Sequence, residues 1–344
     1  MKRLVILGGG FAGAKIAKAL ENNFETTLID SKDFFEYTPG ILRSIVYPKH
    51  LKKIQVLHRH YLHKSKILNE YVIYVNNKSV KTNKSNLKFD YLVIALGSSY
   101  NLPIKEKNVI MITRGNHLRD YYDLLCKSKE ITIIGGGIVG VELAAEISDF
   151  YKDKEITIIH NKEKLMERNS NKMINYAENY LKKKGIKIIY NETAINYKGN
   201  IIKTNKGTKI KSDITFICTG IKPNSQPLEK YFKNTLNEKK QIIVNDYLQV
   251  KSFKNIFVAG DITDIKEEKL AQNAKKQANI VIHNLLNLEN NKPLLKYDSK
   301  PRIMVISLGR FNGIFQYKNF VLTGIIPGIL KSLIEWNTMI RYRF

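Results

Sequence analysis

The sequence predicts an α/β protein made of two interleaved, Rossmann-like, doubly wound domains and a C-terminal α+β region. A glycine-rich turn lies between an apolar strand and a helix twice, at 8–13 and at 135–140. A second apolar strand follows each helix, so each unit is βαβ, and such units form a parallel, doubly wound sheet. Three more apolar strands end in small-residue turns, at 91–97, 214–220 and 255–261.

The composition is that of an ordinary globular protein. The chain has 344 residues, of which 43% are hydrophobic and 26% charged, enough for two or three domains. Two cysteines provide neither a disulfide framework nor a CxxC pair. No apolar run is long enough to predict a membrane-spanning helix. The net charge of +26 suits an anionic partner, such as a nucleic acid, a lipid surface or a phosphorylated cofactor. The lysines are scattered among many asparagines, which favours a compositional bias and a solvated surface instead.

The first unit joins a strand at 3–7 to a helix at 14–20 through its glycine turn. Gly8 permits the sharp bend, Gly10 leaves room for a pyrophosphate, and Gly13 lets helix and strand approach closely. The helix N-terminus offers free N–H groups and the positive end of its dipole to phosphates. The unit therefore predicts a dinucleotide site.

Asp30 closes the strand at 26–30 that follows this helix. A carboxylate at that position accepts hydrogen bonds from ribose hydroxyl groups. The first unit thus predicts an adenine dinucleotide with an unphosphorylated ribose.

The second unit repeats the pattern with a strand at 130–134 and a helix at 141–150. Its glycines stand at the matching positions, Gly135, Gly137 and Gly140. Two such turns, each between a strand and a helix, are far more specific than one.

The strand that follows, at 156–160, ends at His160 instead of an acid. Without a carboxylate a 2′-phosphate is not repelled, so this unit predicts NADH or NADPH; an ordinary strand-end role for His160 stays open. Two dinucleotide sites in one chain imply FAD together with NAD(P)H. We expect an FAD domain at 1–106 and 234–295, an inserted NAD(P)H domain at 107–233, and a C-terminal region at 296–344 that covers the flavin.

Several further segments carry a family resemblance over almost the whole chain, from about 2 to 342. The sequence resembles the apoptosis-inducing-factor-like, mitochondrion-associated proteins, also called ferroptosis suppressor proteins, among the flavoproteins with two dinucleotide-binding domains. These proteins are related to the type II NADH dehydrogenases. The most specific segments are 140–147 (GVELAAEI), 156–160 (ITIIH), 218–222 (CTGIK), 244–250 (VNDYLQV), 260–261 (GD), 308–310 (LGR) and 327–332 (PGILKS).

The resemblance implies bound FAD, NAD(P)H as electron donor and a quinone as acceptor. It places FAD contacts at the first glycine turn, at Arg43, by a looser alignment at Val72, and at Asp261. With the strand-end turns, the expected cofactor-binding residues are Gly8, Gly9, Gly10, Phe11, Ala12, Gly13, Asp30, Arg43, Val72, Ala95, Gly97, Gly135, Gly137, Gly140, His160, Gly220, Gly260 and Asp261. A plain surface role for Arg43 stays open.

Glu142 and Lys331 are the expected catalytic residues. The resemblance places Glu142 beside the nicotinamide and the flavin, and Lys331 near the flavin. An ammonium group there stabilises negative charge on a reduced flavin or a quinone oxygen. A helix-N-terminal acid for Glu142 and a solvated lysine for Lys331 stay open. The expected reaction passes a hydride from the nicotinamide to the flavin and then two electrons to the quinone.

The two ends of the chain bear on its location. Met1-Lys2-Arg3 leads into a run of four apolar residues, too short for a signal peptide, and position 2 is not the glycine of a myristoylation motif. We therefore expect a cytoplasmic or peripheral membrane protein. A C-terminal apolar helix face would lie in a membrane interface or over a quinone entrance, or pack on the chain's own body or on a second subunit of a homodimer; it comprises Ile329, Leu330, Leu333, Ile334, Asn337 and Ile340, with Trp336 beside it.

Three other functions stay open. They are a reductase of a protein acceptor of ferredoxin or rubredoxin type, a membrane-bound respiratory NADH dehydrogenase, and a nucleic-acid-binding or signalling flavoprotein with weak redox activity. The histidines at 58–63 lack the carboxylates and cysteines of a metal site, so we expect no metal. We also expect no thiol chemistry at Cys126 or Cys218, because the helix at 14–20 carries no cysteine pair.

Overall fold

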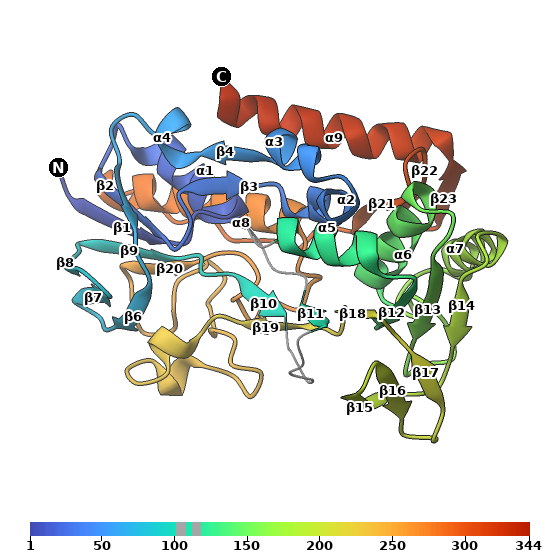
Figure 1. Ribbon diagram of the computed structural model, residues 1–344. Helices are drawn as coiled ribbons and strands as arrows, with labels where there is room; N and C mark the ends of the chain where they lie inside the picture. The colour runs from blue at the N-terminus through green and yellow to red at the C-terminus, as the bar shows by residue number, and fades with distance from the viewer. Residues whose placement is uncertain (101–107, 112–117) are drawn as a thin grey trace.

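The computed structural model describes residues 1–100, 108–111 and 118–344, and two five-stranded parallel sheets dominate them (Figure 1). The predicted α/β class with doubly wound sheets is confirmed. The expected domain boundary at 106/107 lies outside the described residues.

The first sheet has the strand order β20-β9-β1-β2-β5, and every neighbouring pair is parallel. Its strands are β1 (Arg3–Leu7), β2 (Glu25–Asp30), β5 (Lys66–Asn69), β9 (Tyr91–Ile94) and β20 (Ile256–Val258). Helices α1 (Phe11–Leu20) and α8 (Ala271–Glu289) pack against each other beside this sheet.

The second sheet has the order β11-β18-β12-β13-β14 and is also parallel. Its strands are β11 (Val109–Met111), β12 (Glu130–Ile134), β13 (Glu155–Ile159), β14 (Lys187–Ile189) and β18 (Ile214–Ile217), and its helices are α5 (Leu118–Lys127), α6 (Ile138–Phe150) and α7 (Asn171–Lys183). All five strands fall in sequence between β9 and β20 of the first sheet. This order suits an inserted domain, and the expected domain boundaries stay a proposal.

Both helices that follow the glycine turns begin three residues earlier than the expected starts at 14 and 141. Gly10 and Gly137 are the residues that precede the helices, so the third glycine of each turn lies inside the first helical turn. A Cβ on Gly13 would stand 1.8 Å from the Gly8 carbonyl oxygen, and one on Gly140 1.9 Å from that of Gly135. Helix and strand therefore touch through these glycines, as predicted.

Smaller elements connect the two halves and cover their edges. They include the antiparallel sheets β3 (Phe34–Glu36) with β4 (Gln55–Leu57), β6 (Val72–Val75) with β7 (Ser79–Thr82) and β8 (Asn86–Lys88), β10 (Ser98–Tyr100) with β19 (Ile221–Pro223), and β15 (Ala194–Lys198) with β16 (Ile201–Thr204) and β17 (Lys209–Lys211). The short helices are η1 (Thr38–Gly40), α2 (Ile41–Val46), η2 (Pro48–His50), α3 (Leu51–Ile54), α4 (His58–Tyr61), η3 (Gln226–Leu228) and η4 (Lys233–Thr235).

The C-terminal region is a three-stranded antiparallel sheet followed by one long helix. The strands are β21 (Ile303–Leu308), β22 (Asn312–Tyr317) and β23 (Phe320–Gly324), and the helix is α9 (Ile325–Arg343). Helix α9 runs from this sheet back across α3, β4 and α4 of the N-terminal half (Figure 1). Across the described part of the chain, every helix is too short or too polar to cross a bilayer.

Part of the apolar face predicted on α9 is turned outward, whereas Ile334 lines the main cavity. Ile329, Leu333 and Trp336 are 55%, 54% and 62% exposed, whereas Met339 and Tyr342 are buried. Of the alternatives for this face, packing on the chain's own body is therefore wrong for Ile329 and Leu333. The reason is that Pro327, Gly328 and Thr338 occupy the inner side of the helix, so its inward face is rotated from the one that the apolar spacing indicates.

Candidate functional site

The two glycine turns open into one cavity of about 1960 Å³. Pockets for single small molecules measure roughly 300–1,000 Å³, so this cavity has room for two dinucleotides. It is lined by the expected residues Gly8, Gly10, Phe11, Ala12, Asp30, Val72, Ala95, Gly97, Gly135, Gly137, Glu142, His160, Gly220, Gly260, Asp261 and Lys331. Gly9, Gly13 and Gly140 stand behind the lining, in the turns themselves.

Both turns fit a diphosphate. A Cβ on Gly10 or Gly137 would meet no atom within 4 Å, so the glycines leave the cavity wall open beside the backbone. At Gly8 and Gly135 the backbone has φ of +96° and +110°, a conformation that favours glycine. The first turns of α1 and α6 lack a side-chain cap, so their N–H groups remain free for an anion.

Asp30 fixes the first turn from behind. Its carboxylate accepts a hydrogen bond of 2.5 Å from the Gly9 N–H and another of 2.9 Å from the Lys32 N–H. The buried His58 ring lies 3.7 Å from Asp30 Oδ2. Burial opposes ionisation of Asp30, but His58 and Lys32 outweigh burial and lower its pKa to about 2. Asp30 is therefore an anion that holds the turn and also lines the cavity.

His58 is a supporting residue that sequence reasoning missed. Its side chain is fully buried, and its Nδ1 lies 2.6 Å from the Tyr61 hydroxyl. The sequence pattern at 58–63 indicates a half-exposed strand or helix edge, whereas the structure buries the first histidine of the run against Asp30.

His160 holds the second turn as Asp30 holds the first. Its Nδ1 accepts a hydrogen bond of 3.1 Å from the Gly136 N–H. That nitrogen therefore carries no proton, and the ring proton stands on Nε2, 3.5 Å from Glu167 Oε2. The imidazole thus takes over the turn-holding role of a carboxylate, while its Nε2 is buried beside the Glu167 carboxylate.

Glu142 and Lys331 meet inside the cavity. Lys331 Nζ, on α9, lies 2.7 Å from Glu142 Oε1, on α6. The same oxygen accepts hydrogen bonds from the Ser307 N–H at 2.7 Å and from the Ser307 hydroxyl at 3.1 Å. Both charged side chains are almost buried, at 7% and 15% exposure. The structure thus brings together the two residues expected to be catalytic, 189 positions apart, and adds Ser307.

Arg43 does not line the cavity. Its guanidinium donates to both carboxylate oxygens of Glu146, at 2.8 and 3.2 Å, and to the Gly309 carbonyl oxygen at 3.2 Å. These bonds join α2, α6 and the C-terminal sheet. The FAD contact expected of Arg43 stays a prediction.

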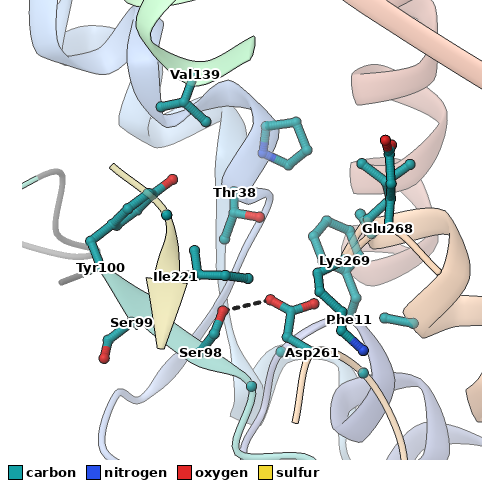
Figure 2. A pocket seen from close by; sticks show the side chains of 18 of the residues that line it. Phe11, Thr38, Ser98, Ser99, Tyr100, Val139, Ile221, Asp261, Glu268 and Lys269 are labelled. Carbon is teal, nitrogen blue, oxygen red and sulfur yellow. Dashed lines mark hydrogen bonds between the residues drawn. The ribbon is translucent and has the colours of Figure 1, made fainter. Parts of the chain in front are cut away.

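Asp261 lies at the meeting point of the two halves. Ser98, on β10, donates a hydrogen bond of 2.6 Å to Asp261 Oδ2 (Figure 2). The neighbouring Gly260 N–H donates to Gln277 Oε1 at 2.6 Å. Figure 2 shows Ser98, Ile221 and Asp261 around one part of the cavity, so β10, β19 and the end of β20 position this wall together. Ser98 and Gln277 carry no sequence motif that could have revealed them.

The two cysteines are unpaired, and they differ in surroundings. Cys126 is exposed, whereas Cys218 is buried in the cavity wall. Burial raises the pKa of the Cys218 thiol far above its usual range. This thiol stays protonated and is a poor nucleophile.

Known proteins match this chain in sequence and in fold. The family model described as pyridine nucleotide-disulphide oxidoreductase matches residues 2–278. Apoptosis-inducing factor homolog A of Dictyostelium discoideum is 35% identical and covers 96% of this chain and 89% of its own length. Ferroptosis suppressor protein 1 of Mus musculus is 30% identical and covers 98% of this chain and 95% of its own. These relatives confirm the resemblance seen in the sequence.

Two solved structures share the fold over the whole chain. NDH2 from Plasmodium falciparum, solved in complex with NADH, has a TM-score of 0.88 at 16% identity and is covered over 96% of its length. The sulfide:quinone oxidoreductase of Aquifex aeolicus has a TM-score of 0.85 at 19% identity and is covered over 92%. The chain belongs to the pyridine nucleotide-disulphide oxidoreductase family and is an oxidoreductase that depends on FAD and on NADH or NADPH.

Proposed function

We propose that this chain is an NAD(P)H:quinone oxidoreductase. The observation that carries the proposal is the Glu142–Lys331 ion pair. It places a proton donor, Lys331, and a proton acceptor, Glu142, in the cavity that both glycine turns share. The sulfide:quinone oxidoreductase with the same fold supports the choice of a quinone.

The two turns divide the cofactors between them. The first turn, with Asp30 behind it, would hold the diphosphate and ribose of FAD, and the second turn, with His160, those of NAD(P)H. Bound FAD supplies the chemistry of accepting a hydride and passing two electrons to the acceptor. The protein supplies the alignment of the two binding sites and the charges around them.

Lys331 and Glu142 serve the acceptor. The balanced reaction is NAD(P)H + H⁺ + quinone → NAD(P)⁺ + quinol, so one proton must come from outside the nicotinamide. The Lys331 ammonium group donates a proton to the reduced quinone's oxygen and, while charged, stabilises negative charge there. Glu142 and the Val305 carbonyl oxygen, 3.3 Å from Lys331 Nζ, hold the ammonium group in place.

Helix α9 supports an apolar acceptor. Lys331 and Ile334 line the cavity, while Ile326, Ile329 and Leu333 of the same helix are more than half exposed. A lipid-soluble quinone would enter beside this helix from a membrane surface that the exposed side chains contact. Co-sedimentation with anionic vesicles tests this contact, and a Leu333→Ser variant that sediments like the parent protein would contradict it.

The central test is the absorbance of the flavin. The purified protein is mixed anaerobically with NADH or NADPH and then with menadione or a short-chain ubiquinone. We expect bleaching by the nucleotide and rapid recovery with the quinone. Bleaching without recovery would favour a protein acceptor, and a protein that binds no flavin would overturn the proposed function.

A further inference from the structure

A second, much smaller cavity lies directly behind Lys331. Its volume is about 20 Å³, and the side chains around it include Arg43, His50, Glu146, Ser307, Lys331 and Glu335. A polar cavity needs roughly 10–15 Å³ and two to four polar partners to hold one water molecule. The small cavity meets both conditions.

Two side chains connect the small cavity with the proposed acceptor site. Lys331 lines both cavities. Ser307 lines the small cavity, and its hydroxyl donates to Glu142 Oε1 at 3.1 Å. A water molecule in the small cavity would therefore lie beside the residues that hold the ion pair.

The outer wall of the small cavity is a second pair of titratable side chains. His50 Nε2, at the end of η2, lies 3.2 Å from Glu335 Oε2. Glu335 follows Lys331 by four residues on α9, so both side chains lie on one face of the helix. The His50 side chain is 6% exposed and that of Glu335 18%, so Glu335 reaches the solvent while His50 does not.

The backbone leaves little room around this pair. A Cβ on Gly40 would stand 2.7 Å from Glu335 Oε2 and 3.4 Å from His50 Nε2. The His50–Glu335 contact is therefore enclosed by the chain and is not a loose surface ion pair.

Charged side chains of both signs surround the small cavity. Glu146 on α6 and Glu335 on α9 line it together with the cations Arg43 and Lys331. Glu142 does not line it but pairs with Lys331. Burial raises the pKa of Glu146, with Arg43 opposing and Glu142 adding to the rise. Tyr37, just before η1, stays protonated because burial and the nearby carboxylates of Glu335 and Glu142 raise its pKa.

We propose that His50, Glu335 and one water molecule in the small cavity form the proton inlet of this enzyme. The inference rests on the proposed function. Lys331 gives its proton to the reduced acceptor, the resulting amine takes a proton from the water, and the water takes one from His50. His50 regains it from the solvent through Glu335. Each turnover thus moves one proton from the solvent to Lys331, and no electron passes along this path. His50 and Glu335 supply protons to Lys331 and do not touch the acceptor. They are therefore positioning residues and not catalytic ones.

The test compares two oxidants on the same reduced holoenzyme. A quinone takes up protons when it is reduced, whereas ferricyanide takes electrons alone. In His50→Gln and Glu335→Gln, we expect flavin reoxidation by the quinone to fall about tenfold relative to reoxidation by ferricyanide in the same variant. We also expect a larger solvent deuterium isotope effect with the quinone, and partial recovery of His50→Gln by added imidazole.

The matched controls are a histidine and a glutamate away from the small cavity, each replaced by glutamine. His283→Gln changes an exposed histidine on α8, and Glu289→Gln breaks the exposed ion pair with Lys2. We expect both to keep the parent's ratio of the two reoxidation rates. Flavin content and thermal melting show that each variant is folded, and Glu335→Gln, at a partly exposed position, keeps the test available if His50→Gln does not fold.

Two different failures are distinguishable. The proposed inlet is wrong, and the His50–Glu335 pair is only structural, if the variants slow flavin reoxidation by the quinone and by ferricyanide to the same extent. An unchanged solvent isotope effect would lead to the same conclusion. If the parent protein is reduced by NAD(P)H but not reoxidised by any quinone, the proposed function is wrong and the inlet falls with it.

Discussion

At the scale of single residues, the cavity depends on a few buried charges that are each held by several partners. Glu142 Oε1 faces two hydrogen-bond donors of Ser307 and the Lys331 ammonium group. A buried pair is costly to break from one side, since the remaining charge loses its partner. Chemistry and stability can therefore be separated here by single and double substitutions.

Lys331→Met should slow flavin reoxidation by a quinone about 10²–10³-fold, because the cation and proton donor are lost. It should also lower the melting temperature more than the double variant Lys331→Met/Glu142→Gln does, since the double variant leaves no unpaired carboxylate. Stopped-flow spectroscopy and thermal denaturation check the two statements. A single variant as stable as the double one would contradict the pairing.

Asp30 should contribute stability that disappears in acid. Its folded-state pKa of about 2 lies below the roughly 3.9 of an unfolded aspartate. A carboxyl group whose pKa is lowered by folding stabilises the protein above its unfolded pKa, and this contribution is lost as the pH falls from about 4 to about 2. We expect Asp30→Asn to cost about 2 kcal/mol at neutral pH, and the difference from the parent to vanish near pH 2. Chemical denaturation across this pH range is the measurement.

His160 should control the choice between NADH and NADPH. In His160→Asp, a carboxylate can still accept the Gly136 N–H, but it repels a 2′-phosphate and accepts from a ribose hydroxyl. We expect the ratio of kcat/KM for NADH over NADPH to rise about tenfold. His160→Asn, which adds no charge, is the control, and an equal rise in that variant would show that repulsion is not the cause.

At the scale of elements, the glycine turns show that one residue type performs two tasks within six positions. Gly13 is required by packing, because a Cβ there would collide with the Gly8 carbonyl oxygen. Gly10 is not required by packing, since a Cβ there would point into open space. The same contrast holds in the second turn between Gly140 and Gly137.

The substitutions Gly10→Ala and Gly13→Ala should therefore fail in different ways. Gly10→Ala should fold with a melting temperature near that of the flavin-free parent but bind FAD weakly, because its methyl group occupies the proposed phosphate position. Gly13→Ala should lose about 1–3 kcal/mol of stability, because α1 must move away from β1. Flavin content and denaturation of the flavin-free proteins separate the two effects, and a destabilised Gly10→Ala would count against the cavity as described.

At the scale of the whole molecule, the cavity is built by all three parts of the chain. Its walls come from both parallel sheets, and α9 contributes Lys331 and Ile334. A ligand that fills such a cavity binds the folded state alone and stabilises it by mass action. FAD at a hundred times its Kd should raise the unfolding free energy by about 2.7 kcal/mol. Thermal melts with increasing FAD check this, and a melting temperature that ignores FAD would contradict the site.

Much of this architecture is readable without a structure. The two glycine turns, the strands beside them and the α/β class follow from the sequence, because backbone conformation at glycine and apolar periodicity are local properties. Asp30 and His160 are also placed at strand ends by local pattern alone. The predicted starts of the two helices are three residues too late. The reason is that the last residues of each glycine motif already belong to the first turn of the helix.

The tertiary structure alone decides which side chains meet. It pairs Glu142 with Lys331 and His50 with Glu335, and it sets His58 against Asp30. It also turns Arg43 onto Glu146 and leaves Ile329 and Leu333 of α9 exposed. These outcomes depend on how helices distant in sequence pack and on which charges must be paired once they are buried. The sequence by itself thus determines the fold class and the two dinucleotide-binding turns, while long-range packing determines the charged groups that surround the acceptor.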